Sequence, residues 1–161
     1  MKTILLDDFL LDEFDFNNDN HLKLEKNLIN STNSDLISKD IDRFIKKNHE
    51  LGLRDNITNT YVVKYNNNLI GLVFVNYHPE EVRDEVLLKE EIEIGTGLID
   101  EYRGKHLGTL LEKELSKKLL DTYPNFNEIV AKINKDNINS IKAITNAGFI
   151  HISDDEYYFK R

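Results

Sequence analysis

The strongest constraint on the fold is the stretch from Glu91 to Thr122, where an acidic and apolar strand runs through a short polar turn into an amphipathic helix. The turn carries Gly104 and Gly108, and glycine lets a ligand approach the backbone closely. The first amides of a helix have no acceptor within the helix and carry partial positive charge. Arg103 and Lys105 add full charges at the same place. The stretch therefore predicts a phosphate site at the start of the helix.

The spacing of the glycines excludes two common phosphate motifs. No Gly-Lys-Ser or Gly-Lys-Thr closes the turn as in a Walker A loop, and the dinucleotide pattern G-x-G-x-x-G is absent. The specific signal is the order of segments: the acidic and apolar strand, then Tyr-Arg-Gly-Lys, then Leu-Gly-Thr, then a long helix. A second signal follows one strand later in NKDNINSIKAITNAGF, residues 134–149.

Together these two segments resemble the GNAT superfamily of acyl-CoA-dependent N-acetyltransferases, and the pattern is closest to its RimJ/RimL-like branch. The family's cofactor loop reads Q/R-x-x-G-x-G/A. Residues 103–108 fit this pattern, except that His106 stands where the first glycine is usual. In the second segment, the residues that match the family's Asn-x-x-Ala/Ser start, apolar helix and Gly-Phe end are Asn137, Ser140, Ile141, Gly148 and Phe149. The motifs cover residues 90–150, and the expected order of strands extends the resemblance over most of the chain.

The resemblance implies acetyl-CoA as cosubstrate, with its pantetheine arm lying along the central strand like an additional strand. The expected contacts to the arm are backbone groups of Thr96, Gly97 and Leu98. The residues expected around the pyrophosphate are Arg103, Gly104, Lys105, His106, Leu107, Gly108 and Thr109. Asn137 is expected to contact the cofactor, to cap the helix that follows, or both, and Ser140 is similar. The simpler alternatives are that the glycines around Thr96 only relieve crowding, and that Lys105 is only a solvated side chain.

A general base is required because an alkylammonium must lose a proton before its nitrogen attacks a thioester. Strand alternation puts Glu91 and Glu93 on one face of the central strand. The run Glu93-Ile94-Gly95 resembles the RimL-like branch, where the matching glutamate lies near the acceptor, so Glu93 is the expected base. The two glycines around Thr96 predict a bulge or a close approach of another backbone or a ligand, and a bulge could re-aim this face. The alternative for Glu93 is an exposed strand carboxylate.

The general acid expected for this family is missing from its usual place. The family often has a tyrosine in its last helix, and the matching position here is Ile144. Tyr157 and Tyr158 are other tyrosines that could act, although the sequence does not place them. His106 is expected at a helix start beside phosphate and not as a base. The remaining histidines show no metal-ligand spacing, so no metal site is predicted and solvated or packed roles are expected for His21, His49, His78 and His151.

Length and composition limit the remaining possibilities. A chain of 161 residues suits one domain, taken as residues 1–161. Its net charge of −8 argues against nucleic acid or an anionic membrane as partner, and is compatible with an amine-bearing small molecule or a protein or peptide amine. The absence of cysteine excludes disulfides and thiolate catalysis. No apolar run is long enough for a signal-peptide core or a membrane span, so a cytoplasmic location is expected, as a monomer or a homodimer.

The pattern along the chain predicts a sheet of mixed direction with helices on both faces. The resemblance implies an α/β (α+β) GNAT fold, in which a mixed, mostly antiparallel sheet of six to seven strands is splayed at the cofactor site. The expected strands are residues 3–6, 60–65, 69–77, 90–99, 128–133, 149–153 and 157–160. The expected helices are residues 21–29, a helix capped by Ser38 or Asp40 and ended by Gly52, residues 104–120 and residues 137–147. Residues 7–20 receive no assignment, Asn66-Asn67-Asn68 predicts a hairpin turn, and residues 79–84 read as a polar connection.

The function that this pattern predicts is direct transfer of an acetyl group from acetyl-CoA to a primary amine. The acceptor is left open among a protein N-terminus, a polyamine, an amino acid, an aminoglycoside and other small amines. The main alternative is a GNAT-like module that binds CoA as a sensor or regulatory ligand without turnover, which the missing tyrosine favours slightly. A plain α/β protein without a cofactor would require both motifs to be coincidental.

Overall fold

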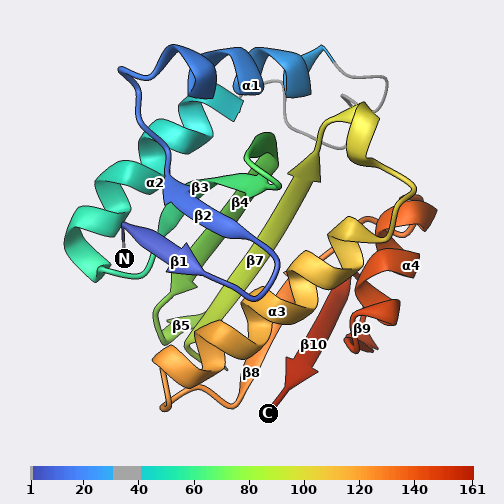
Figure 1. Ribbon diagram of the computed structural model, residues 1–161. Coiled ribbons are helices and arrows are strands. Elements are labelled where there is room, and N and C mark those ends of the chain that lie inside the picture. The colour runs from blue at the N-terminus through green and yellow to red at the C-terminus, as the bar shows by residue number, and fades with distance from the viewer. Residues whose placement is uncertain (1, 31–40) are drawn as a thin grey trace.

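The computed structural model describes residues 2–30 and 41–161. Its main sheet has eight strands in the order β1-β2-β3-β4-β7-β8-β10-β9 (Figure 1). Every neighbouring pair in it is antiparallel except β7 and β8, which are parallel. The strands of this sheet are β1 (Thr3–Leu5), β2 (Leu10–Glu13), β3 (Asn59–Tyr65), β4 (Asn68–His78), β7 (Glu91–Leu98), β8 (Glu128–Lys132), β9 (Ile150–Ser153) and β10 (Glu156–Lys160). The mixed, mostly antiparallel sheet is as predicted.

Helices cover both faces of the sheet, as predicted. The helices are α1 (Asp19–Ile29), α2 (Ile41–Asp55), α3 (Leu107–Thr122) and α4 (Ile138–Asn146), with a short 3₁₀ helix η2 (Asp100–Tyr102) before α3. α1 and α2 pack Leu28 and Ile45 against Leu72 of β4 on one face. On the other face, α3 crosses in front of the sheet in Figure 1, and its leucines pack with α4 against Ile92 and Ile129. The hydrophobic core between the sheet and α3 is larger than the core between the sheet and α1 and α2.

Two turns form as their residues predict. β3 and β4 are joined at Asn66 and Asn67, whose φ angles of 49° and 64° are those of a tight hairpin turn that asparagine tolerates. Gly148 follows α4 with φ 104°, so it ends that helix in a conformation that glycine adopts without strain. The final hairpin, β9 and β10, turns at Asp154 and Asp155.

The structure corrects three expectations about the elements. The sheet gains β2 from the unassigned segment, so it has eight strands and not six or seven. The connection at residues 79–84 is partly a second hairpin, β5 (Glu81–Arg83) with β6 (Val86–Leu88), turning at Asp84 and Glu85 with φ 49° and 64°. α3 begins at Leu107, later than predicted. The proposed helix caps Ser38 and Asp40 lie outside the described residues.

Gly52 does not end α2, which continues to Asp55. A Cβ at Gly52 would lie 2.0 Å from the carbonyl oxygen of Thr58, so glycine is needed there for close packing against the following chain. The helix ends where Asn56 turns to φ 60° and the Asp55 carboxylate accepts the amide of Thr58 at 2.7 Å. Among the described residues, no helix is both long enough and apolar enough to cross a bilayer.

Candidate functional site

The central strand β7 separates from β8 after two paired positions. β7 pairs with β4 along its whole length, from His78↔Glu91 to Gly71↔Leu98, without a register shift. It pairs with β8 only at Ile92↔Ile129 and Glu93↔Val130, while β8 continues along β10 as far as Lys132. The predicted splay is therefore confirmed, but the predicted bulge is wrong: β7 stays regular and β8 leaves it. Within residues 2–30 and 41–161, no strand pairs with the edge of β7 from residue 94 to residue 98 on that side.

The regular register decides which backbone groups face this opening. The amide of Ile99 donates to the carbonyl of Ile70 at 2.9 Å, so Ile99 points toward β4. Because neighbouring residues of a strand point their backbone groups to opposite edges, those of Gly97 also face β4, and those of Thr96 and Leu98 face the opening. The close approach predicted at the glycines is real but lies on the β4 side. A Cβ on Gly71 would lie 2.2 Å from the carbonyl oxygen of Gly97.

The loop after β7 delivers an uncapped helix start to the same opening. His106 precedes α3 with φ 61° and ψ 12°, the left-handed conformation that glycine adopts most easily, and its side chain makes no capping hydrogen bond. Gly104 also has positive φ, 70°, and a Cβ there would have no neighbour within 4 Å. The first intrahelical bond runs from the amide of Leu110 to the carbonyl of His106. The amides of residues 107–109 therefore have no acceptor within the helix, and no acidic side chain stands in its first turn.

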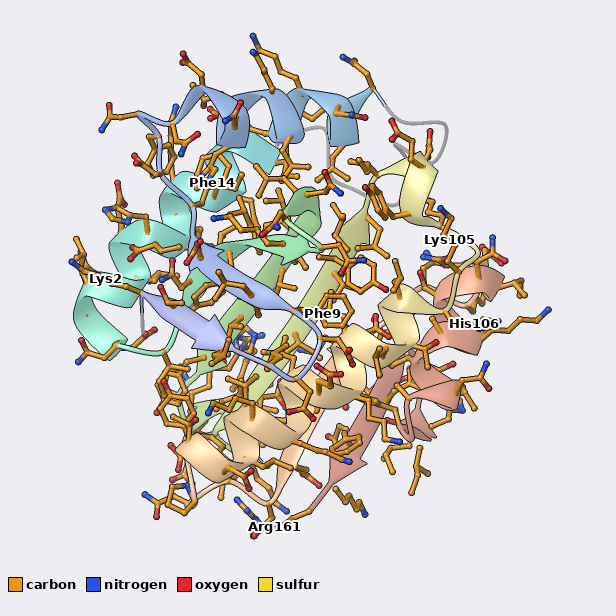
Figure 2. All side chains as sticks on the ribbon, viewed as in Figure 1. Lys2, Phe9, Phe14, Lys105, His106 and Arg161 are labelled. Atoms are coloured by element: carbon orange, nitrogen blue, oxygen red, sulfur yellow. The ribbon has the colours of Figure 1, made fainter. Side chains whose placement is uncertain are left out.

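Most side chains of the predicted phosphate loop hold the loop itself. Arg103 Nε donates to the carbonyl of Leu98 at 2.9 Å and lies 3.5 Å from an Asp100 carboxylate oxygen. Lys105 Nζ lies 5.4 Å from the centre of the Tyr102 ring. Figure 2 places Lys105 and His106 at the N-terminal end of α3, beside α4. The charge of Arg103 is thus used partly to fix the strand-to-helix turn, so backbone amides are the main donors left for an anion.

α4 is joined to this loop by two polar contacts. Thr109 Oγ1 donates to the carbonyl of Ala143 at 3.1 Å, which ties the first turn of α3 to α4. The Asn137 side chain accepts the amide of Ser140 at 3.2 Å, so Asn137 caps α4 as its residue type favours. The structure thus shows the capping role for Asn137, and a contact from Asn137 or Ser140 to a cofactor stays a prediction.

Glu93 and Glu91 lie on one face, as predicted, and form a polar network at the other end of the opening. Glu93 Oε2 lies 2.8 Å from His78 Nε2 and 3.6 Å from Lys132 Nζ. Lys132 Nζ is also 3.3 Å from Glu91 Oε1. His78, for which a solvated or packed role was expected, is 46% exposed and in addition pairs with Glu93. The antiparallel register of β4 and β7, which pairs His78 with Glu91, is the signal that could have placed it.

The network shifts the protonation of its members. Burial alone would raise the pKa of Glu93, but the hydrogen bond with His78 and the charge of Lys132 together outweigh it and hold the pKa below its usual range. The hydrogen bond from Glu93 raises the pKa of His78, against the opposing effect of burial. The dyad therefore favours an ionised carboxylate next to an imidazole that gains its proton more easily than usual.

In the described part of the chain, His78, Glu91 and Glu93 are the one group of side chains close enough together to share a metal ion. One ligand atom each of His78, Glu91 and Glu93 lies within 4.8 Å of the others. The ammonium of Lys132 already lies against both carboxylates, so a cation is supplied by the protein itself. We assign the group as an ion-pair network. A site that holds one ammonium between carboxylates has the charge and the acceptors to attract a second.

The two tyrosines considered as general acids lie on β10, which pairs with β8 on the side away from β7. Tyr157 is 7% exposed, and its ring stacks on His151 with centroids 4.8 Å apart. The Tyr158 hydroxyl donates to Glu156 at 3.1 Å, and burial together with Glu156 raises its pKa to about 12. Ile144 is buried at 1% exposure in the core under α3. Two surface hollows among the described residues lie elsewhere than the opening. One, of about 320 Å³, is lined by Tyr77 and Phe126 among others, and the second, of about 490 Å³, by Leu5 and Lys113 among others.

Comparison with known proteins gives a consistent result. Residues 12–150 match the family model described as an acetyltransferase (GNAT) domain. No curated protein sequence matches the chain. A solved structure of AAC(6')-Ib in complex with paromomycin and acetyl-CoA is similar over 96% of this chain and 94% of its own, with 17% identity and a TM-score of 0.74.

Two further structures share the fold. The Campylobacter jejuni N-acetyltransferase PseH in complex with acetyl coenzyme A is similar over 95% of this chain and 99% of its own, with 20% identity and a TM-score of 0.62. The ribosomal L7/L12 alpha-N-protein acetyltransferase RimL, in its apo form, is similar over 99% of this chain and 94% of its own, with 16% identity and a TM-score of 0.66.

Proposed function

Because the chain belongs to the GNAT acetyltransferase family, we propose that it transfers the acetyl group of acetyl-CoA directly to a primary amine. The observation that carries this proposal is the open edge of β7. One end of the edge meets the uncapped start of α3, and the other end meets Glu93 with its partners His78 and Lys132. A cosubstrate held along this edge has an anion site at one end and a proton acceptor at the other.

The residues present fit acetyl-CoA. The amides of residues 107–109 suit a pyrophosphate, because they lack acceptors and no carboxylate repels an anion from the first turn. Gly104, which has no neighbour around its Cβ position, leaves room for close approach of the ligand. The backbone groups of Thr96 and the amide of Leu98 face the opening and suit the amides of a pantetheine arm, while the carbonyl of Leu98 already accepts Arg103 Nε. We assign Gly97 to pairing with β4, and Arg103 mainly to holding the loop.

The chain's own groups orient the reaction and move protons. When bound, acetyl-CoA supplies the acyl group and a thiol leaving group. The strand backbone beside residues 94–96 holds the thioester where oxyanion charge develops. Glu93, whose carboxylate is ionised at neutral pH, accepts a proton from the incoming ammonium, directly or through water. His78 holds Oε2 of Glu93 in place and is the alternative acceptor when it is neutral.

The acceptor enters from the face of the sheet that carries Glu91, Glu93 and Lys132. These side chains form an anionic rim with one ammonium already bound, so a cationic amine suits the site better than an anion. Among the similar structures, AAC(6')-Ib is described as an aminoglycoside acetyltransferase and RimL as a protein N-terminal one. We keep both kinds of amine as candidates for this chain. The GNAT assignment favours the enzyme over a CoA sensor without turnover.

The proposal is tested by binding and then by turnover. Calorimetry with acetyl-CoA is expected to show one site per chain, and free thiol is expected to appear with at least one amine from a panel of an aminoglycoside, a polyamine, an amino acid and an N-terminal peptide. Gly108→Val is expected to abolish binding, because its added methyl groups crowd the anion site. Gly108→Ala is the matched control, since its Cβ would lie 3.8 Å from Leu98, an ordinary contact. Unchanged affinity in Gly108→Val refutes the site, and binding without thiol release on the panel supports the sensor.

A further inference from the structure

We propose that the buried carboxyl group of Glu112 is the acid that protonates the sulfur of the departing CoA, which rests on the acetyl transfer proposed above. Glu112 lies in α3, 8% exposed, under the open part of β7. Its Oε1 accepts a hydrogen bond from Thr96 Oγ1 at 2.7 Å. Its Oε2 is buried without a hydrogen-bond partner among the described residues, and so is Ser116 Oγ one helical turn later.

The position of Glu112 along α3 turns it toward the corner between α3, α4 and the opening. Thr109, three residues earlier, contacts Ala143 of α4, and residues three or four apart on a helix share a face. Thr109, Glu112 and Ser116 therefore form a polar stripe on the side of α3 that faces α4 and β7. An unpartnered carboxyl oxygen is costly in such a dry corner, so its retention points to a ligand group that completes its hydrogen bonding.

Glu112 contacts β7 at Thr96, and this is the position along β7 where the sulfur of the cosubstrate must lie. The pantetheine arm enters from the start of α3, near Leu98, and the thioester carbon must come within reach of Glu93. The sulfur precedes that carbon along the arm, so it lies on the Leu98 side of Glu93, beside Thr96. Glu93 and Thr96 are three residues apart, about 10 Å along a strand, and their side chains point to opposite faces. The base and the acid thus approach the thioester from opposite faces of the sheet.

The chemistry requires such a group. Glu93 takes one proton from the ammonium, and the amine nitrogen forms a bond to the thioester carbon. The carbon–sulfur bond then breaks with its electron pair on sulfur, Glu112 gives its proton to sulfur, and the nitrogen loses its second proton to water. Glu93 passes its own proton to solvent. Glu112 regains a proton from solvent, so an ammonium and acetyl-CoA become an amide, CoA thiol and one released proton. Ile144, at the position matched to the usual tyrosine acid, is apolar and supplies no proton.

Glu112 carries the proton that this role needs. Burial raises the pKa of Glu112 to about 7, and the hydrogen bond from Thr96 lowers it to a smaller extent. Burial and the hydrogen bond from Thr96 are the two causes of the shift, and no charged group contributes to it. A carboxylic acid that is neutral up to about pH 7 in an apolar surrounding can donate to a developing thiolate.

The first test compares wild type with Glu112→Gln, which keeps the size and the contact with Thr96 but removes the acid. With an amine that supports turnover, the ratio of wild-type to Glu112→Gln thiol release is expected to be about 10²-fold or more below pH 7 and to fall about tenfold per pH unit above it. Acetyl-CoA affinity is expected to stay unchanged. Glu114→Gln, the same substitution at a half-buried position of α3 whose carboxylate accepts the amide of Asp8, is the control and is expected to leave the ratio at one. A ratio that does not vary with pH overturns the proposal.

Two further measurements separate a chemical role from a packing role. Thr96→Val removes the hydrogen bond that lowers the Glu112 pKa, so the fall in turnover is expected to move to higher pH while the acid is retained. The titration of the Glu112 carboxyl carbon, followed by NMR, is expected to differ between complexes with CoA and with desulfo-CoA, which lacks the sulfur. Identical titrations in the two complexes overturn the proposal. Absence of acetyl-CoA binding or of any turnover in wild type refutes the proposed function itself.

Discussion

Replacement of Glu93 by glutamine tests the base at the centre of the site. The side chain is 21% exposed and is held by His78 at 2.8 Å, and glutamine keeps both its volume and an oxygen that can face His78. The fold should therefore persist, while the proton acceptor is lost. An alkylamine with a pKa of about 10.4 is unprotonated in only about one molecule in 2,500 at pH 7, so turnover then depends on this small fraction. We expect a loss of about 10²-fold, equivalent to about 2.7 kcal/mol of transition-state stabilisation.

The assay is release of CoA thiol across pH 6 to 9 with a confirmed acceptor, together with calorimetry for acetyl-CoA. The ratio of wild-type to Glu93→Gln turnover should shrink as pH rises, because unprotonated amine becomes available without a base. The pKa of His78, measured by NMR, should fall when its charged partner is removed. Glu91→Gln is the matched control on the same face and should cost less, because Glu91 contacts Lys132 and has no contact with His78 in the described network. Equal turnover of wild type and Glu93→Gln at every pH would make Glu93 a structural carboxylate.

Two predictions concern stability. Gly71→Ala places a Cβ 2.2 Å from the carbonyl oxygen of Gly97, which belongs to the backbone and cannot move easily, so we expect the free energy of unfolding in urea to fall by about 3 kcal/mol. Gly95→Ala is the control, because its Cβ would lie at an ordinary 3.8 Å from Phe74. Equal losses in the two variants would show that the β4–β7 contact is not as tight as described. Because the pKa of His78 is raised in the folded state, its contribution to stability is present below the unfolded value of about 6.5 and is lost as pH rises through the folded value. The difference in urea midpoint between wild type and His78→Gln should therefore be larger at pH 6 than at pH 9, and a constant difference would contradict the ion pair.

The parts of the site that local sequence determines were predictable. The glycine-bearing turn, the helix after it and the Asn137 cap depend on residues within a few positions of one another, and they form where the pattern indicates. His106 shows why the family pattern favours glycine: the position is left-handed, and histidine occupies it at a cost of about 1–2 kcal/mol. The hairpin at Asn66 and Asn67 has the same local origin.

The parts that depend on pairing between distant segments were not predictable in the same way. The two glycines around Thr96 suggested a bulge, because from one strand alone a bulge and a departing neighbour look alike. Only the registers of both neighbours of β7 distinguish them. His78 illustrates the same limit, since nothing near it in the chain identifies Glu93 as its partner 15 positions away.

Glu112 marks the limit most clearly. Glu112 lies three residues before Leu115 and seven before Leu119, so helical spacing puts it beside the buried leucines, and the structure buries it although its residue type favours solvent. The side of α3 that carries Thr109 and Glu112 lies against α4 and β7, as the contacts from Thr109 to Ala143 and from Thr96 to Glu112 show. Helical periodicity identifies the strip but not what covers it. Burying an ionisable side chain without a hydrogen-bond partner costs free energy. A buried glutamate on a helix face that a second helix covers is therefore better explained by a role in binding or proton transfer than by packing.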